Sequence, residues 1–412
     1  MMQNLVSSKH GLVCSKTTDL SWTVEAVKQI EYQVRIADDL FGPGNDTALF
    51  GLPGRQLSPG DRRLVVIDTN VAAIHGDRIR NFFDANDIET QIVPVTADET
   101  VKRWDSVTAV VDAMNDFRID RRREPVIAIG GGVLTDVVGF AASIFRRGTP
   151  YIRIPTTLIG LVDAGVGVKT GINYKLGKNR LGTYQHADVT LLDRTFLRTL
   201  QRRHISNGLG EILKMALIKS RELFELLENS GRDILADHFQ GSTQELDRAA
   251  RTIIAESIHL MLEELQPNLW EATLERCVDY GHTFSPTIEM HALPELLHGE
   301  AVSIDMALTT AIGMRRGYIT EADAARVFRV MRALELPLWN EVLARPGILD
   351  AALADTVRHR DGQQRLPLPV GIGHHLFVND LTPQELHAGS EYLATVEVRF
   401  PAHFDDSART AG

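Results

Sequence analysis

The chain has 412 residues, 44% hydrophobic and 24% charged, a composition that excludes a disordered or fibrous protein and a single small module. Its 54 acidic residues outnumber its 44 basic residues, and the net charge of −10 disfavours nucleic acid and anionic membranes as partners unless basic residues gather locally. With two cysteines, no secretory signal pattern and no uncharged stretch of about 20 residues, we expect a cytoplasmic protein without disulfides or a membrane span.

The first half of the chain predicts alternating strands and helices. Short strands are expected within 22–36, and a loop rich in glycine and proline within 41–60. Runs of β-branched residues predict strands at 63–68, 90–95, 125–129 and 151–155. Helical periodicity lies between them at 74–85 and 107–117, and a helix-like segment follows the glycines at 130–132. This order predicts a parallel sheet covered by helices on both faces.

The second half predicts helices almost throughout. Its long amphipathic segments lie at 205–228, 244–264, 272–284, 300–316 and 321–334. We therefore place a boundary near Asp193 and predict an α/β domain over 1–193 and a mostly α-helical domain over 194–412. The last residues, 407–412, are expected to fray.

A run of three glycines at 130–132 joins a predicted strand to a helix-like segment. Backbone N–H groups there can approach a phosphate without obstruction by Cβ atoms, and the helix dipole favours the anion. The run departs from the G-x-G-x-x-G fingerprint, and a tight turn in any α/β protein gives the same pattern. Asp68, at the end of the first long strand, can accept hydrogen bonds from ribose hydroxyls or cap the following helix. Both interpretations stay open.

A cationic segment over 165–182 stands out in this acidic chain. It contains four cations, two asparagines and five glycines. Such a segment can hold a phosphate by charge-assisted hydrogen bonds, although an ordinary solvated loop is the alternative. We interpret it as a flexible phosphate-binding loop.

Three residues far apart in the chain, Glu211, His282 and His298, are candidate metal ligands. Two neutral imidazoles and one carboxylate leave an open position on zinc for a substrate hydroxyl, whose acidity the metal raises. Their spacing alone cannot assemble the site, and with 14 histidines in the chain any one of them can be an ordinary histidine.

The segment that contains His282 gives a further expectation. If 272–284 is a helix, then Glu275, Asp279 and His282 follow i, i+4, i+7 and line one face, and Pro286 ends or kinks the helix. An acid one turn before a metal ligand is either a catalytic group or an orienting partner of that ligand.

Taken together, these segments resemble the sugar phosphate cyclases, the superfamily of 3-dehydroquinate synthase, in order from about residue 64 to 380. The motifs that carry the resemblance are Val-Ile-Asp68-Thr-Asn70, Gly130-Gly-Gly-Val-Leu-Thr-Asp136, Phe-Arg-Arg147-Gly, Pro155-Thr-Thr-Leu, Asp163, Lys169-Thr-Gly, Leu-Gly-Lys178-Asn179, Asn207-Gly-Leu-Gly-Glu211-Ile-Leu-Lys214, Gly281-His282 and His298-Gly-Glu-Ala-Val.

The resemblance implies a Rossmann-like N-terminal domain that binds NAD, a helical C-terminal domain that binds metal, a cleft between them and a homodimer. It implies Zn²⁺, or Co²⁺ in its place, on Glu211, His282 and His298. The implied NAD contacts are Asp68, Asn70, Glu99, Lys102, Gly131, Gly132, Asp136, Thr156, Thr157, Lys178 and Thr199. The implied substrate or phosphate contacts are Lys169, Asn179 and Lys214, with Asp163 nearby and Arg147 reaching the partner subunit's site.

The chain departs from the 3-dehydroquinate synthase pattern around the metal. Asp279, Pro286 and Glu275 stand where that enzyme has Asn, His and Arg. A substrate carboxylate would meet the acid of Glu275, at a cost on the order of 1 kcal/mol, and on a helix Arg276 would point about 100° away. This departure favours a sugar phosphate without a carboxylate.

Several motifs are similar to the 2-epi-5-epi-valiolone synthases, which cyclise sedoheptulose 7-phosphate. Asp279 and His359 resemble the distinguishing pocket residues of that branch, and Arg358 stands where its members have Lys. The implied reaction is transient oxidation by NAD, β-elimination of phosphate, reduction and intramolecular aldol closure, in the biosynthesis of C7-cyclitol natural products, antibiotics among them. The alternatives are a 2-epi-valiolone or desmethyl-4-deoxygadusol synthase, a 3-dehydroquinate synthase, a metal-dependent polyol dehydrogenase and a cofactor-binding regulator.

Overall fold

The computed structural model describes residues 5–7, 12–15, 21–45, 60–175 and 177–399. The chain divides into two compact units, Met1–Tyr32 and Gln33–Gly412. In the first unit, an antiparallel sheet is formed by β1 (Leu5–Ser7), β2 (Leu12–Ser15) and β3 (Ser21–Val24). The strands expected within 22–36 are both present, but β4 belongs to a sheet of the second unit. Most of the loop expected over 41–60, and the tail at 407–412, lie outside the described residues.

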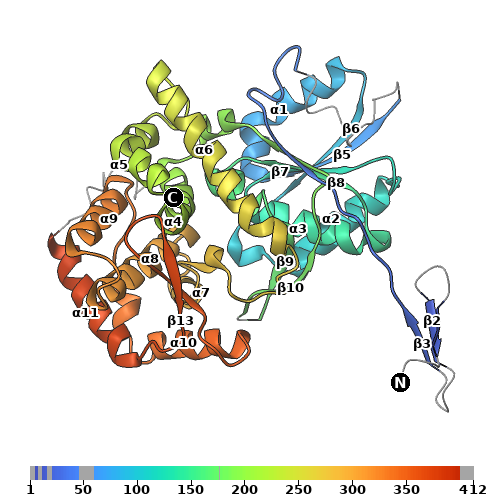
Figure 1. Ribbon diagram of the computed structural model, residues 1–412. Helices are drawn as coiled ribbons and strands as arrows, with labels where there is room; N and C mark the ends of the chain where they lie inside the picture. Colours follow the sequence, from blue (N-terminus) through green and yellow to red (C-terminus); the bar gives the residue numbers. More distant parts are fainter. Residues whose placement is uncertain (1–4, 8–11, 16–20, 46–59, 176, 400–412) are drawn as a thin grey trace. The chain divides into compact units, whose positions relative to one another are not determined.

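A six-stranded parallel sheet lies at the centre of the first half of the second unit (Figure 1). Its order is β4-β11-β8-β7-β5-β6. Its strands are β4 (Gln33–Ile36), β5 (Arg62–Asp68), β6 (Glu89–Val95), β7 (Val126–Gly130), β8 (Tyr151–Pro155) and β11 (Val189–Leu192). The central strands are buried on both faces, which is why their sequences are continuously apolar rather than alternating. The predicted parallel sheet is confirmed.

Helices cover both faces of this sheet. Alternate residues of β5 point to opposite sides: Val66 packs in one core with α2 (Trp104–Asp116) and α3 (Gly132–Ile144), and Val65 packs in another with α1 (Thr69–Ala85). Burying each such side chain stabilises the fold by about 1.5–3 kcal/mol. The sheet is thereby held rigid, and its strand ends can position a site.

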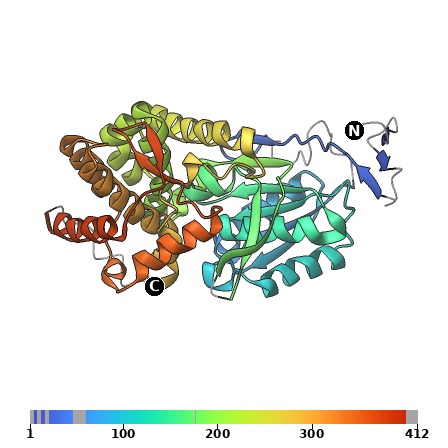
Figure 2. The same ribbon diagram turned by 60° about the horizontal axis from the view of Figure 1, so that its bottom comes forward.

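The second half is mostly helical, and its helices gather into one group (Figures 1 and 2). They are α4 (Arg202–Lys219), α5 (Arg221–Ala236), α6 (Gln244–Leu265), α7 (Ser285–His291), α8 (His298–Arg315), α9 (Glu321–Ala333), α10 (Ile348–His359) and α11 (Pro383–Arg399), with a hairpin of β12 (Leu366–Pro369) and β13 (His375–Val378). The segment predicted as one helix over 205–228 is two, because Ser220 ends α4 and caps α5 by accepting Leu223 N–H at 3.1 Å. The boundary near Asp193 stays a prediction.

The helix predicted over 272–284 is wrong. Only Cys277–Asp279 forms a single 3₁₀ turn, and Gly281 has a φ of 72°, which lies outside helical geometry. A Cβ atom on Gly281 would lie 2.8 Å from Val302 Cγ1 of α8, so the segment packs closely on that helix as a loop. Pro286 lies in the first turn of α7 and does not end a helix.

The cationic segment is a β-hairpin and not a loop. Strands β9 (Lys169–Tyr174) and β10 (Gly177–Tyr184) pair antiparallel, with Gly171 opposite Gly182. A Cβ atom on Gly171 would lie 2.7 Å from the carbonyl oxygen of Leu181. These glycines therefore permit close approach of two backbones, and their number reflects packing rather than flexibility.

Among the described residues, no helix combines the length and the apolar composition that crossing a bilayer requires.

An ion pair fastens α11 to the end of α8. Arg316 donates from Nε and Nη2 to the two carboxylate oxygens of Glu385, at 2.6 and 2.9 Å. The bonds from Arg316 outweigh burial and lower the pKa of Glu385 from 4.5 to about 2. Since the folded-state pKa is the lower one, the pair contributes stability above pH 4.5 and loses that contribution as the pH falls through 2.

We therefore expect Glu385→Gln to lower the free energy of unfolding at pH 7 by about 1 kcal/mol. Urea unfolding at pH 7 and at steps below pH 5 checks this, because the deficit should shrink toward acid pH. Glu391→Gln, an exposed position of the same helix, is the control and should change stability by less than about 0.5 kcal/mol. A deficit that is the same at every pH would contradict the assignment.

Candidate functional site

The carboxyl ends of β5, β7 and β8 lie side by side and bring together four predicted cofactor residues. Thr156 N–H donates to the carbonyl of Gly130 at 3.0 Å, and a Cβ atom on Gly130 would lie 3.1 Å from Asp68 Cβ. A Cβ atom on Gly131 would lie 3.2 Å from Thr157 Cγ2. The glycines thus let the three strand ends approach one another at an edge where α/β sheets bind ligands.

Asp68 caps α1, because its Oδ1 accepts N–H bonds from Asn70 and Val71 at 2.8 and 3.3 Å. The capping interpretation is confirmed, and the contact with ribose stays a prediction. Gly131 precedes the first turn of α3 and makes no side-chain cap, so the N–H groups of that turn can bind an anion. Thr199, another predicted NAD contact, places its Oγ1 3.0 Å from Nε2 of His75 on α1.

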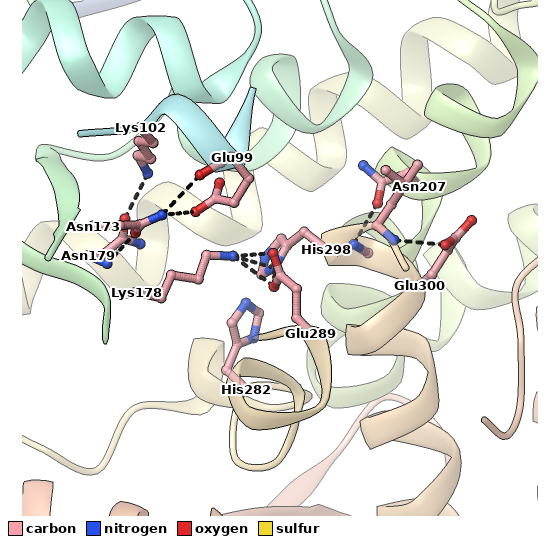
Figure 3. Close-up of polar contacts among 12 residues, drawn as sticks. Glu99, Lys102, Asn173, Lys178, Asn179, Asn207, His282, Glu289, His298 and Glu300 are labelled. Atoms are coloured by element: carbon pink, nitrogen blue, oxygen red, sulfur yellow. Dashed lines mark hydrogen bonds and ion pairs between the residues drawn. The ribbon is translucent and has the colours of Figure 1, made fainter. Parts of the chain in front are cut away.

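A polar network links the sheet half to the hairpin (Figure 3). Lys102 is 3% exposed, and its Nζ donates at 2.7 Å to both Asp136 Oδ2 and Asn179 Oδ1. Asn173 donates from Nδ2 to Glu99 Oε1 at 2.7 Å and accepts Asn179 N–H at 2.8 Å. Burial would lower the pKa of Lys102, but Asp136 and Glu99 outweigh it and raise that pKa. Four predicted residues therefore meet here, joined by Asn173, which the sequence analysis did not single out.

The three candidate metal ligands come together from three elements. Glu211 lies on α4, His282 in the loop before α7, and His298 at the first residue of α8. Glu211 Oε1 is 3.5 Å from His282 Nε2 and 3.3 Å from His298 Nε2, and one ligand atom of each residue lies within 4.8 Å of the others. That buried oxygen accepts no hydrogen bond from the described residues, and the donor set of two nitrogens and one oxygen fits Zn²⁺.

Both imidazoles direct Nε2 at Glu211 because Nδ1 is engaged elsewhere; Figure 3 shows the contact of His298 with Glu289. His282 Nδ1–H donates to the carbonyl of Tyr280 at 3.0 Å, and His298 Nδ1–H donates to Glu289 Oε2 at 2.9 Å. Burial lowers the pKa of His282 to about 4, which keeps it neutral. Burial and Lys178 oppose a protonated His298, but Glu289 and Glu211 outweigh them and raise its pKa to about 9, so metal binding at neutral pH releases that proton.

Lys214 supplies a buried cation next to the metal-ligand candidates. Its Nζ lies 2.6 Å from Glu211 Oε2 and 3.6 Å from Asp163 Oδ1, so two predicted catalytic residues join the triad. Burial would lower the pKa of Lys214 and raise that of Glu211. Their mutual attraction outweighs burial, raising the pKa of Lys214 and holding that of Glu211 well below its usual range.

Asp279 lies between two arginines. Its Oδ1 is 3.4 Å from Arg276 Nη1 and its Oδ2 is 3.3 Å from Arg360 Nη2. The expectation that Arg276 points away along a helix is therefore wrong, because the segment is a loop that turns Arg276 inward, and Glu275 is exposed. The role of Asp279 as a pocket residue stays a prediction.

Two of the predicted site residues, Arg358 and His359, lie at the end of α10. Arg358 is 72% exposed at its side chain and pairs with Asp355 at 3.3 Å, whereas Arg360, which the sequence analysis did not select, contacts Asp279. The side chain of His359 lies outside the described part of the structure. Roles for Arg358 and His359 stay predictions.

A cavity of about 380 Å³ opens over the hairpin. Its lining includes Asp136, Lys169, Asn179, Arg180, Tyr184 and Glu271. Lys169 and Arg276 both form ion pairs with Glu271, and Tyr184 Oη donates to Glu271 Oε2 at 3.2 Å. The lining carries two cations, Lys169 and Arg180, beside two acids, and its size and its cations suit a small phosphorylated ligand. Glu271 is a further residue that the sequence analysis missed.

Arg147 is exposed at the end of the turn Phe145–Arg147, with a φ of 67°. No contact joins it to the other candidates within the described residues, so its reach to a partner subunit stays a prediction.

The hairpin connects the cavity with the metal-ligand candidates. Asn179 lines the cavity, and its neighbour Lys178 places Nζ 2.7 Å from both oxygens of Glu289, the carboxylate that binds His298. Lys178, predicted as an NAD contact, therefore also contacts the carboxylate that orients a candidate metal ligand. An acid seven residues after His282 was the available signal for Glu289, since metal-binding histidines commonly donate to carboxylates.

Comparisons with known proteins agree with this geometry. Residues 92–207 match the family described as 3-dehydroquinate synthase N-terminal, and residues 208–357 match 3-dehydroquinate synthase C-terminal. A 2-epi-5-epi-valiolone synthase of Streptomyces albus is 60% identical over 370 residues, covering 89% of each chain. A demethyl-4-deoxygadusol synthase of Trichormus variabilis is 40% identical over 372 residues, covering 90% of this chain and 89% of that one.

Among solved structures, the 2-epi-5-epi-valiolone synthase ValA of Streptomyces hygroscopicus subsp. jinggangensis, with NAD⁺ and Zn²⁺ bound, superposes with a TM-score of 0.85. It is 49% identical, and the match covers 91% of this chain and 100% of that one. The predicted fold, an α/β Rossmann-like half followed by a helical half, is confirmed. The chain belongs to the 3-dehydroquinate synthase family of sugar phosphate cyclases.

Proposed function

We propose that this enzyme converts sedoheptulose 7-phosphate into 2-epi-5-epi-valiolone and releases phosphate, with NAD and Zn²⁺ as cofactors. The observation that carries the proposal is the direct link between the cavity over the hairpin and a His-His-Glu cluster through adjacent residues, Asn179 and Lys178. The 60% identity to a synthase of that name supports the choice of substrate.

The chain's own residues fit both cofactors. Zn²⁺, or Co²⁺ in its place, would be held by Glu211, His282 and His298, and NAD by the strand ends at Asp68, Gly131 and Thr156. When bound, NAD supplies a reversible hydride acceptor, and the metal raises the acidity of a substrate hydroxyl.

The lysines of the site bind and orient the substrate. Lys169 and Asn179, which line the cavity, would hold the phosphate by charge-assisted hydrogen bonds. Lys214 keeps its proton, because its pKa is raised, so it donates to substrate hydroxyls and does not act as the base. We assign the abstraction of the proton during β-elimination to the departing phosphate.

The charges around Asp279 favour a substrate without a carboxylate. Arg276 and Arg360 both pair with Asp279, so a substrate carboxylate at this place would also meet the negative charge of Asp279. Since Glu275 is exposed, it is Asp279 rather than Glu275 that disfavours a carboxylate on the substrate. It disfavours the substrate of 3-dehydroquinate synthase.

We also propose a homodimer in which the exposed Arg147 reaches the site of the partner subunit. Its position at the surface, away from the chain's own cavity residues, supports this role.

Incubation of the protein with sedoheptulose 7-phosphate, NAD⁺ and Zn²⁺ should release one phosphate per sugar with no accumulation of NADH, because the hydride returns to the product. Phosphate release from the carboxylated shikimate precursor, and none from the heptulose, would overturn the proposal. Stoichiometric NADH would indicate a polyol dehydrogenase. NMR of the product separates 2-epi-5-epi-valiolone from 2-epi-valiolone and from demethyl-4-deoxygadusol, the product named for the 40% identical relative.

A further inference from the structure

A buried carboxylate, Glu289 of α7, lies between the metal-ligand candidates and the hairpin (Figure 3). The residue is 2% exposed, so its negative charge requires partners inside the protein. It has two: Oε2 accepts Nδ1–H of His298 at 2.9 Å, and both oxygens lie 2.7 Å from Lys178 Nζ. Neither the ligand set nor the cavity accounts for this residue.

The bond to His298 fixes which nitrogen the ring presents. With its proton on Nδ1, the neutral imidazole must offer the lone pair of Nε2, and that atom faces Glu211 Oε1 at 3.3 Å. His282 reaches the same state by donating to a backbone carbonyl. The orientation of His298 therefore depends on a side chain, whereas that of His282 does not.

The bond to Lys178 extends the link to the other half of the site. Lys178 precedes Asn179 on β10, and Asn179 accepts from Lys102 of the sheet half. A single carboxylate thus joins the first turn of α8 to the hairpin that lines the cavity.

We propose that Glu289 is a positioning residue that orients His298 for metal binding and, through Lys178, holds the hairpin against the metal centre. The inference rests on the proposed function only in taking Glu211, His282 and His298 as the metal ligands.

Metal affinity tests the proposal without turnover. Full-length apoprotein is titrated with Zn²⁺ in competition with a chromophoric chelator. Glu289→Gln keeps the size of the side chain and removes its charge, and we expect its Zn²⁺ affinity to fall by roughly 10- to 100-fold, as for other lost partners of metal-binding histidines. Lys178→Met leaves the carboxylate on His298 and should lose less affinity than Glu289→Gln.

Glu300→Gln is the matched control. Glu300 is also a buried acid, two residues from His298 on the same helix, but it pairs with Arg203 and caps Leu297 N–H. It should bind Zn²⁺ as wild type does. Wild-type affinity in folded Glu289→Gln would overturn the proposal.

A second measurement uses the wild-type protein and therefore does not require any variant to fold. In wild-type protein loaded with Zn²⁺, ¹⁵N-histidine NMR should place the metal on Nε2 of His298 and a proton on Nδ1. A metal-bound Nδ1 would overturn the proposal. Absence of phosphate release from the heptulose would count against the proposed reaction alone, because neither readout requires turnover.

Discussion

Replacing His282 with alanine should lower kcat for phosphate release from sedoheptulose 7-phosphate by about 10³-fold or more, because a bound metal contributes several kcal/mol of stabilisation to developing charge. His282 is one of the three candidate ligands that the described residues bring together, and the two that would remain, Glu211 and His298, would hold the ion weakly. Zinc content of the purified variant, measured alongside steady-state kinetics, should fall with the rate.

The matched control is His291→Ala. His291 is an exposed histidine of α7 whose Nδ1 interacts with the carbonyl of Thr287, outside the cluster. It should keep wild-type turnover and metal content. Full turnover in His282→Ala would contradict the metal triad, whereas a wild-type protein that binds NAD⁺ and turns over no substrate would favour the cofactor-binding regulator.

The hairpin shows where composition misled the sequence analysis. Five glycines and four cations over 165–182 indicate a flexible loop, because glycine is usually a residue of turns. In the structure, Gly171 and Gly182 face each other across β9 and β10, where any Cβ would clash with backbone. Roles for the charged side chains stay predictions, but strand pairing places Lys169 and Asn179 at the cavity and Lys178 beside Glu289.

The segment before α7 shows a different failure. Glu275, Asp279 and His282 have the spacing of a helix face, and no local signal outweighs it except Gly281. The loop forms because Gly281 must fit against Val302 of α8, a contact between residues 21 positions apart that no local period reveals. Arg276 and Arg360 consequently meet at Asp279 through tertiary structure.

The strands, and the grouping of the three candidate metal ligands, were more predictable. Buried parallel strands need continuous apolar runs, so the bounds of β5, β7 and β8 were each predicted to within one residue. The candidate ligands Glu211, His282 and His298 were selected by chemical type and resemblance, and the fold brings them together. Glu289 and Glu271 were missed because the partners they neutralise come from distant elements.

Lys214 gives the second large expected effect, on stability rather than rate. Lys214 and Glu211 are each about 1% exposed and pair at 2.6 Å, so Lys214→Met would leave a buried carboxylate without its nearest cation. Losing one partner of a buried pair costs about 3–5 kcal/mol, and we expect that loss in the metal-free protein. Urea unfolding in the presence of a chelator measures it.

Added Zn²⁺ should recover a large part of this loss, because a divalent ion bound at Glu211 supplies the missing positive charge and binds only the folded state. Lys219→Met is the matched control on the same helix: Lys219 pairs with Glu263 and Glu264 near the surface, so its loss should cost about 1 kcal/mol or less and should not depend on Zn²⁺. If Lys214→Met loses the same stability with and without Zn²⁺, then Glu211 is not a metal ligand. A deficit that closes on adding Zn²⁺ would mean that Lys214 holds the carboxylate ready until the metal arrives.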